Sequence, residues 1–401
     1  MTNKIKIPFL LSVLMLTTAA NAQDKQTLFN PVHTAMVSQA IAPDARAGGM
    51  GDVGVATDAD VSSQYWNPAK YPFAISKAGV QLNYTPWLRK LVNDMNIAYL
   101  SGYYRIGDYS AVSASLHYFS LGEVYTSSGG TSDNYDMTIK PYEMSIDAGY
   151  SMMLSEKFSL GAAVRYMFSD MSYSSTEEKK TSGAFAADIA GYYQNYINIG
   201  KRECQLGLGF NISNIGSKMN LTGTDRSEFI PTNLRLGASL KVPIDEYNAI
   251  TVAADVNKLL VPTYPTTEQY EKAVAEGKTT AVNLEQYADE VYYNVGSIAG
   301  IFKSFGDAPG GFKEEMKEIQ LSVGAEYCYN DRFSVRAGYH DEAETKGNRK
   351  YFTIGAGFKM SAFSLDAAYV ISTASSNPLD QTLRFSLAFD IDGIKDLFGR
   401  K

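Results

Sequence analysis

The chain has few residues of the kinds that usually build metal and catalytic sites. It contains three histidines and two cysteines among 401 residues, and no C-x-x-C or His/Cys cluster, so the sequence gives no support for a metal site. The nucleophile-elbow motif G-x-S-x-G and the zinc-protease motif H-E-x-x-H are also missing. A phosphate loop is missing too, because no Lys-Ser/Thr pair follows the glycines of 48–51. We therefore expect no catalytic residues, no metal and no cofactor.

Basic residues are also outnumbered by acidic ones, since the formal net charge is −7. Nucleic acid is therefore excluded as a partner, because neutralising phosphates takes clustered Lys and Arg. Beyond the N-terminus, no apolar run reaches the roughly 20 residues of a spanning helix. The chain nevertheless has 28 Tyr and 19 Phe. Many aromatic residues without apolar helices are typical of a membrane β-barrel.

Residues 1–22 have the features of a secretory signal peptide. Lys4 and Lys6 precede a short apolar stretch, and Ala20-Asn21-Ala22 forms a small-residue cleavage site. The apolar stretch is shorter than a spanning helix needs, although an uncleaved anchor helix is the alternative. We expect an exported mature chain that starts near Gln23.

From Ala78 onward apolar and polar residues alternate, which indicates strands with one apolar face. Several of these segments reach the roughly 9–11 residues with which a tilted strand crosses a bilayer. The sequence predicts fourteen strands: 78–86, 95–106, 109–121, 140–154, 157–169, 183–194, 204–213, 232–243, 248–258, 317–330, 332–341, 350–360, 362–371 and 381–390.

The connections differ in length in a regular way. They are mostly short after even-numbered strands and mostly long after odd-numbered strands, as in bacterial outer-membrane barrels. We expect an all-β fold, a transmembrane antiparallel β-barrel of about 14 strands with an N-terminal hatch inside the lumen. The expected parts are the hatch, 23–77, the barrel, 78–390, its longest loop, 259–316, and a short tail, 391–401. An even strand count also predicts that the N- and C-termini both lie on the short-turn, periplasmic side.

The predicted hatch is centred on Ile41–Ala69, a stretch rich in Gly and Ala that alternates poorly. Glycine suits a chain that must pack closely against a barrel wall, and a proline fixes the turn that leads into the first strand. The hatch residues singled out are Gly48, Gly49, Met50, Gly51, Trp66, Asn67, Pro68 and Ala69.

The faces opposite the apolar ones carry both signs of charge, and we expect them to line the lumen. Most of these groups should pair with one another and with the hatch, and a selective permeation path is the alternative. The residues are Glu143, Asp147, Arg165, Asp188, Arg235, Lys241, Asp255, Glu326, Arg336, Lys359, Asp366 and Arg384. His117 also faces inward by parity, where it is more commonly structural than catalytic.

Loop 259–316 is predicted to contain ordered structure. Thr267–Glu276, followed by Gly277, indicates a short capped helix. Further on, apolar residues precede a Pro-Gly-Gly turn, and this stretch either folds over the barrel mouth or docks a partner. The candidate partner-binding residues are Ile301, Phe302, Phe305, Asp307, Pro309, Gly310, Gly311 and Phe312.

The two cysteines, Cys204 and Cys328, fall on opposite faces of strands that are not neighbours. We therefore expect free thiols, although an exported protein could also form a disulfide.

Three stretches carry a resemblance to known families. Asn67-Pro68-Ala69, which closes a Gly/Ala-rich segment before a fourteen-strand pattern, resembles the FadL-like outer-membrane barrels. More specifically, residues 41–56, 64–70 and 307–315 resemble the PorV family of the type IX secretion system of Bacteroidota. The chain departs from many outer-membrane barrels because a tail follows Phe389.

The resemblance to the PorV family implies a shuttle in the outer membrane, surrounded by outer-membrane lipid. Such a shuttle binds the C-terminal signal domain of secreted cargo at the large translocon barrel. It then delivers the cargo to a surface attachment complex that contains a sortase-like protease. The long-loop rim would receive these partners, and the hatch would keep the lumen shut. The alternatives are a FadL-like transporter of hydrophobic small molecules and a lipopolysaccharide deacylase, a chemistry for which the sequence offers no supporting residues.

Overall fold

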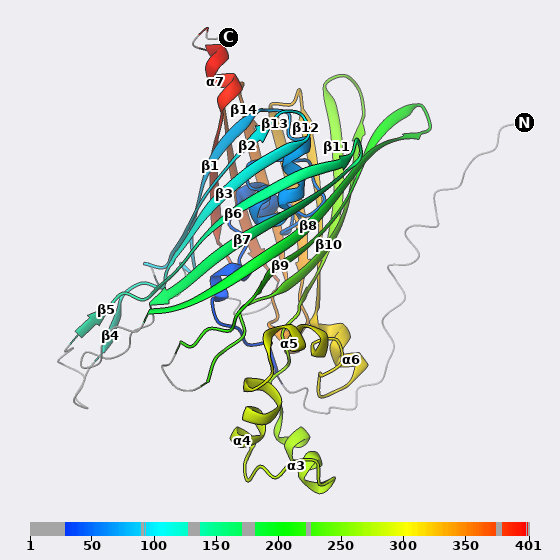
Figure 1. Ribbon diagram of the computed structural model, residues 1–401. Helices are drawn as coiled ribbons and strands as arrows, with labels where there is room; N and C mark the ends of the chain where they lie inside the picture. The colour runs from blue at the N-terminus through cyan, green and yellow to red at the C-terminus, as the bar shows by residue number, and fades with distance from the viewer. Residues whose placement is uncertain are drawn as a thin grey trace, which may run out of the picture.

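The computed structural model describes residues 29–89, 92, 94–126, 137–170, 181–221, 226–373, 379–397 and 399. Fourteen antiparallel strands close into a barrel, in which the first strand pairs with the last (Figure 1). The predicted all-β barrel of fourteen strands is confirmed. The predicted signal peptide, 1–22, lies outside the described residues.

All fourteen predicted strands are present. Their ends differ from the predicted ends by two residues or fewer, except in β8 and β9. The barrel strands are β1 (Ala78–Pro86), β2 (Asn96–Ile106), β3 (Ser110–Ser120), β6 (Tyr142–Ser155), β7 (Phe158–Asp170), β8 (Thr181–Ile199), β9 (Arg202–Gly216), β10 (Asn233–Pro243), β11 (Asn248–Leu259), β12 (Ile319–Tyr329), β13 (Phe333–Asp341), β14 (Tyr351–Lys359), β15 (Phe363–Ser372) and β16 (Leu383–Asp390).

Strands β8 and β9 are longer than predicted. They continue to a two-residue turn at Gly200 and Lys201, where Gly200 has a φ of 67°. In the sequence 194–203, Tyr196 lies on one face of the ribbon and Ile197 and Ile199 on the other, each among polar residues, so the alternation is weak. Backbone pairing holds this part together as a protruding hairpin, from Tyr193–Leu208 out to Ile199–Arg202.

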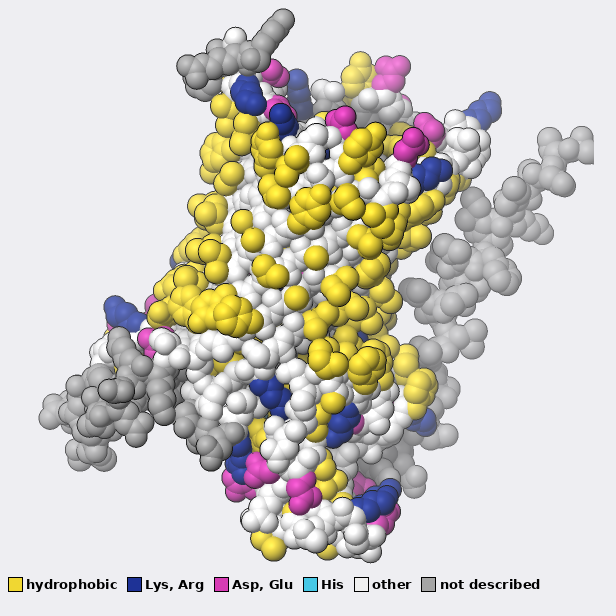
Figure 2. All heavy atoms as spheres, in the orientation of Figure 1, with side chains coloured by type: hydrophobic (Ala, Val, Ile, Leu, Met, Phe, Trp, Pro, Cys, Tyr) yellow, Lys and Arg dark blue, Asp and Glu magenta, His cyan; other side chains and the backbone are white. Residues whose placement is uncertain are grey.

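The outward faces of the strands form an apolar band around the barrel. Leu82, Val164 and Phe185 are 51%, 67% and 71% exposed, and Figure 2 shows such side chains covering the visible wall while charged groups gather toward its two ends. This distribution is what a bilayer requires of a barrel wall. In the part of the chain that the structure describes, no helix is both long and apolar enough to cross a membrane.

The two ends of the barrel differ. Short turns and the terminal helix α7 (Ile391–Leu397) lie at one end, which we call the short-turn end. The long connections lie at the other, the long-loop end, where a small hairpin of β4 (Val124–Thr126) and β5 (Met137–Ile139) projects from the wall (Figure 1).

The β11–β12 connection is largely helical, and its first helix, α3, is the short helix that the sequence predicted at 267–276. Thr266 caps α3 through a capping box with Gln269, and Gly277 follows the helix with a φ of 66°. The elements are α3 (Thr267–Ala275), α4 (Leu284–Ala288), the π-helix η3 (Asp289–Tyr293), α5 (Ser297–Lys303), α6 (Phe312–Glu315) and the 3-10 turn η4 (Met316–Glu318). A further 3-10 turn, η5 (Glu344–Lys346), lies in the β13–β14 connection.

The described chain begins at the long-loop end, where the Asn30 amide donates to the Thr345 carbonyl. It then passes through the barrel and enters β1 at the short-turn end, where the Ser76 hydroxyl donates to Asp390. The first described residue therefore lies at the end opposite to the one expected for the N-terminus, and the N-terminus itself lies outside the described residues. Strand parity places only the ends of the barrel wall, and the N-terminal segment adds one more crossing.

Both cysteines are free thiols, as expected. Cys204 is buried and Cys328 is half-buried.

Candidate functional site: the N-terminal segment and the surface loop

The N-terminal segment, residues 35–74, crosses the barrel in short helical turns. These are η1 (Val37–Ala40), α1 (Ala45–Gly48), α2 (Ser63–Trp66) and η2 (Pro68–Phe73). None is long enough to be stable alone, so caps and wall contacts must hold them. Asp44 caps α1 by accepting from the Ala47 amide at 2.9 Å, and Asn67 caps η2 by accepting from the Ala69 amide at 3.0 Å.

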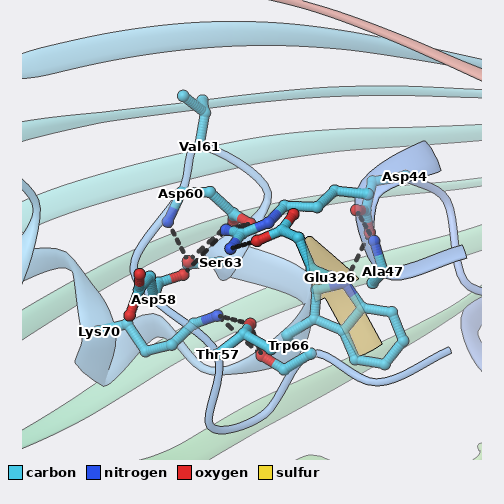
Figure 3. A network of polar contacts seen from close by, with 12 residues as sticks. Asp44, Ala47, Thr57, Asp58, Asp60, Val61, Ser63, Trp66, Lys70 and Glu326 are labelled. Carbon is cyan, nitrogen blue, oxygen red and sulfur yellow. Dashed lines mark hydrogen bonds and ion pairs between the residues drawn. The ribbon is translucent and has the colours of Figure 1, made fainter. Parts of the chain in front are cut away.

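Side chains within the segment hold its turns together (Figure 3). The Trp66 indole donates to Asp44 at 2.6 Å, and the Lys70 ammonium donates to the Gly54 carbonyl at 2.7 Å. Lys70 is fully buried. Because a buried ammonium without acceptors is costly, this contact fixes Gly54 close to η2.

Inward side chains of the wall bind the backbone of the segment. Asp255 on β11 accepts from the amides of Gly54 and Val55 at 2.7 and 3.0 Å. Elsewhere on the wall, five strands away, the Ala45 amide donates to Ser386 on β16 at 2.8 Å. The wall therefore satisfies backbone groups that the irregular segment leaves unpaired.

Charged side chains form a second set of links between segment and wall. Arg46 pairs with Glu326 on β12 at 3.3 Å and with Asp60 of the segment at 3.0 Å. Arg336 on β13 pairs with Glu326 and with Asp366 on β15, both at 2.6 Å. Glu326 thus lies between two arginines, one from the segment and one from the wall.

The predicted inward charges follow the same pattern, except for Lys359, which is exposed. Arg165 pairs with Asp147 and Asp188 at 3.1 and 2.9 Å, and Arg235 donates to the Tyr65 carbonyl at 3.0 Å. The described contacts agree with mutual pairing of these groups and pairing with the N-terminal segment. Further links of this kind join Glu143 to the Ser38 amide, Lys241 to Asp58 and Arg384 to Asp52.

The hatch residues singled out in the sequence all lie inside the barrel, where they are buried. Gly51 has a φ of 74°, and a Cβ built on it would lie 2.6 Å from the Tyr339 nitrogen of β13. The Gly49 backbone packs against Gly355 of β14. At these two positions the segment touches the wall without room for a side chain.

The inward histidines are enclosed. His117 is 3% exposed, and its Nδ1 lies 2.9 Å from the Gln39 amide nitrogen. His340 is 5% exposed, and its Nδ1 lies 2.9 Å from the Ser322 hydroxyl. Within the described ranges, no group of three or more His, Cys, Asp or Glu side chains is placed to hold a metal ion.

At the long-loop end, buried ion pairs fasten the base of the β11–β12 connection. Lys258, the penultimate residue of β11, pairs with Glu315 and Glu318 at 3.3 and 2.6 Å. Lys346 of η5 pairs with Glu318 at 3.1 Å and with Glu314 at 2.7 Å. Two lysines from different connections therefore fix α6 and η4 against the rim.

Asp307 belongs to the same base. One carboxylate oxygen accepts from the Thr263 amide at 3.0 Å, and the other is buried without a described partner. Burial, and to a smaller extent the nearby Glu315 carboxylate, raise the pKa of Asp307 to about 6, although the hydrogen bond from Thr263 opposes the shift. Asp307 is thus a structural anchor and does not lie on the exposed face of the loop.

Large apolar side chains remain exposed on α5 and α6. Phe302, Phe305 and Phe312 are 75%, 54% and 79% exposed. Ile298 and Met316, which the sequence analysis did not single out, are 56% and 50% exposed. Ile298 and Phe302 are one helical turn apart and so share one face of α5, and Phe305 lies in the turn that follows the end of α5 at Lys303. We call these five residues the apolar loop surface.

The remaining candidate loop residues contribute less to this surface. Ile301 and Pro309 are half-buried, while Gly310 and Gly311 are exposed in the turn that precedes α6. Gly311 has a φ of 66°, which favours glycine at this position. Spacing along α5 could have identified Ile298, whereas nothing local in the sequence marked Lys258 or Lys346 as anchors.

A comparison with protein families decides the family. The sequence model of the family described as "Type IX secretion system protein PorV" matches residues 21–266, which is more than half of the chain. The chain belongs to the PorV family. This PorV-family chain is therefore an outer-membrane component of the type IX secretion system.

Among curated proteins, none matches the PorV-family chain. Among solved structures, it is similar to the monoaromatic hydrocarbon channel TodX deltaS2S3 mutant (12% identity, TM-score 0.49, 86% of this chain and 98% of that chain). It is also similar to the Ralstonia pickettii toluene transporter TbuX (11%, 0.46, 87% and 97%) and to a Pseudomonas aeruginosa FadL homologue (12%, 0.41, 90% and 99%). Because these scores lie below 0.5, the barrel assignment rests on the strand pairing.

Gly51→Ala should destabilise the protein more than Gly107→Ala. Both changes place a Cβ on a residue with positive φ, which costs roughly 1–2 kcal/mol. At Gly107, in a short turn, nothing lies within 4 Å of the new Cβ, whereas at Gly51 it meets the β13 backbone. We expect Gly51→Ala to lower the free energy of unfolding by at least about 1 kcal/mol more. Denaturant titration in detergent, followed by heat-modifiable electrophoretic mobility, measures this difference; equal effects would contradict the close packing.

The packing of the loop base should depend on pH through Asp307. Its pKa in the folded protein, about 6, lies above the ordinary value of 3.8. The stabilising contribution is therefore complete below the ordinary pKa and is lost as pH rises through about 6. Hydrogen exchange at Thr263, corrected for intrinsic rates, should show protection that falls between about pH 5 and pH 7.5.

Asp307→Asn is the matched variant, because an amide oxygen can still accept from Thr263 but does not titrate. Its protection should be independent of pH over the same range. The same pH dependence in both proteins would rule out Asp307 as the titrating group.

Proposed function

We propose that this PorV-family chain is a non-enzymatic shuttle for secreted proteins. In this proposal the long-loop end faces the cell surface, and the short-turn end with α7 faces the periplasm. The long-loop end receives the C-terminal signal domain of cargo at the translocon barrel. The shuttle then delivers the cargo to the surface attachment complex with its sortase-like protease. No covalent step is assigned to the chain itself.

The observation that carries the proposal is the apolar loop surface. Three phenylalanines are more than half exposed, one on α5, one in the turn just after it and one on α6, and buried ion pairs fix the base of this connection. Exposed apolar residues rimmed by polar ones mark interaction sites, and aromatic side chains dominate the energetics of interfaces. A rigid base under exposed aromatic side chains lowers the entropic cost of binding.

The filled lumen supports a role at the ends of the barrel. The N-terminal segment contacts inward side chains from strands on all sides, including Asp147 on β6, Asp255 on β11 and Ser386 on β16. We infer that the segment acts as a plug, which keeps the outer membrane sealed while partners bind outside.

Transport of hydrophobic small molecules is the alternative, and it needs a continuous apolar path. Met50 and Val53 are each 1% exposed and pack against Ala253 in the wall. A cavity of about 390 Å³ opens near the short-turn end, and its lining includes Arg46, Glu326 and Arg336 together with apolar groups such as Phe363 and Met360. Charges at its inner wall favour the shuttle over a greasy conduit.

Replacing Phe302 and Phe305 together with Ser should weaken binding of a purified cargo signal domain. Loss of two exposed aromatic contacts is expected to reduce affinity at least roughly tenfold, because each side chain can supply a large share of the binding free energy. Binding is measured with the purified chain in detergent, and uptake of a labelled lipid is measured in parallel for the transport alternative.

Val282→Ser is the matched control, since Val282 is 76% exposed in the same connection but lies outside α5 and α6. This variant should bind as tightly as the unaltered chain. Unchanged affinity in the double phenylalanine variant would sink the proposed docking role, and lipid uptake that depends on Met50 or Val53 would favour the transporter.

A further inference from the structure

Residues 29–36 form a short strap at the long-loop end, before the chain turns into the barrel. The strap contacts three connections that are distant in sequence. The Asn30 amide donates to Thr345 in the β13–β14 connection at 2.9 Å, and the Ala35 amide donates to the Phe229 carbonyl in the β9–β10 connection at 2.8 Å. The Tyr292 hydroxyl, in the β11–β12 connection, donates to the His33 carbonyl at 3.3 Å.

Apolar packing reinforces these bonds. Val32 packs against a buried cluster of Phe229, Val261 and Tyr292. Met36 is 1% exposed and has a φ of 53°, so the chain makes a tight left-handed turn there as it enters the barrel. The strap therefore joins the loops at its outer end to the plug at its inner end.

Two cations of the β9–β10 connection fix the same part of the β11–β12 connection. The Lys218 ammonium donates to the carbonyls of Tyr292 and Tyr293 at 3.2 and 2.9 Å, where η3 ends. It also lies 3.8 Å from the centre of the Phe229 ring. Arg226 pairs with Asp289, at the start of η3, at 2.7 Å. η3 is thus held at both ends.

The held helix lies directly before the docking helix. Only Asn294, Val295 and Gly296 separate the end of η3 from the start of α5. Val295 itself packs against the cluster that contains Tyr292. The orientation of α5, with Phe302 on its exposed face, is therefore set by contacts around Tyr292.

We propose that the strap positions the apolar loop surface through Tyr292, so that the docking orientation of this surface depends on the segment that leads into the barrel. This inference rests on the proposed docking role of α5. Tyr292 acts as a positioning residue, since it holds the helix that precedes the docking face and does not itself belong to that face. Loop and plug are then one mechanical unit.

The first test compares Tyr292→Phe with Tyr293→Phe. The Tyr292 hydroxyl shares its single proton between the His33 carbonyl and Glu228, both at 3.3 Å, whereas the Tyr293 hydroxyl donates to Glu228 alone. Tyr292→Phe should speed hydrogen exchange of Ser297–Lys303 roughly three- to tenfold and weaken binding of the cargo signal domain. Tyr293→Phe should do so less, and the unfolding temperature of the barrel should stay the same in both. Equal exchange and binding in the two variants would overturn the coupling.

The second test replaces residues 29–34 with a six-residue Gly-Ser linker, which keeps Ala35 and the plug. We expect signal-domain binding to fall at least roughly tenfold, while the amides of Gly54 and Val55 stay protected. If the linker variant binds normally while the double Phe302 and Phe305 variant does not, the positioning role of the strap is wrong but the proposed shuttle function still stands. Normal binding by both would instead remove the docking role itself.

Discussion

The structure depends on pairing the charges that face the barrel interior. Glu326, Arg336 and Asp366 lie on the inner wall and pair with one another. Removing one partner of such a pair leaves an unpaired buried charge, which destabilises the fold by more than the intact pair stabilises it. Arg46 of the N-terminal segment completes this group at 3.3 Å from Glu326. Similar pairings recur across the barrel, so the wall and the segment require each other. Without the N-terminal segment, inward groups of the fourteen-stranded wall such as Glu326 and Asp255 would lose partners.

The same requirement explains the composition of the segment. A chain that must offer backbone amides to Asp255 and Ser386, which lie on separate parts of the wall, cannot form one long helix, because such a helix would use those amides internally. Short capped turns leave amides free for the wall, and glycine at positions 49 and 51 allows the closest approaches. The barrel surface can then be specialised separately, with lipid-facing apolar groups on the wall and exposed aromatic side chains on the helical connection.

The strand plan could be predicted from the sequence because alternation is a local signal. The prediction missed the tip of the β8–β9 hairpin, where apolar and polar residues are mixed on both faces, and it also missed the last residues of β9 and the short strands β4 and β5. The direction of the N-terminal segment could not be predicted in this way, since it depends on the contact of Asn30 with Thr345. The anchors of the loop were also out of reach, because Lys258 and Glu318 are 60 residues apart and their pairing depends on the closed fold. The exposed phenylalanines could be singled out because they cluster along the chain around the Pro-Gly-Gly turn, whereas Ile298, one helical turn before Phe302, was missed.

The seam of the barrel has a consequence for the order of folding. Ala45 and Ser386 are separated by 341 residues along the chain but share a hydrogen bond, and Ser386 lies on the strand that closes the barrel against β1. Contacts between such distant residues bear a loop-closure entropy that local hairpins avoid. Hairpins between successive strands can form early, but the interior is completed only when the last strand pairs with the first. We therefore expect the barrel to close and the N-terminal segment to become fixed inside it in the same late step of folding.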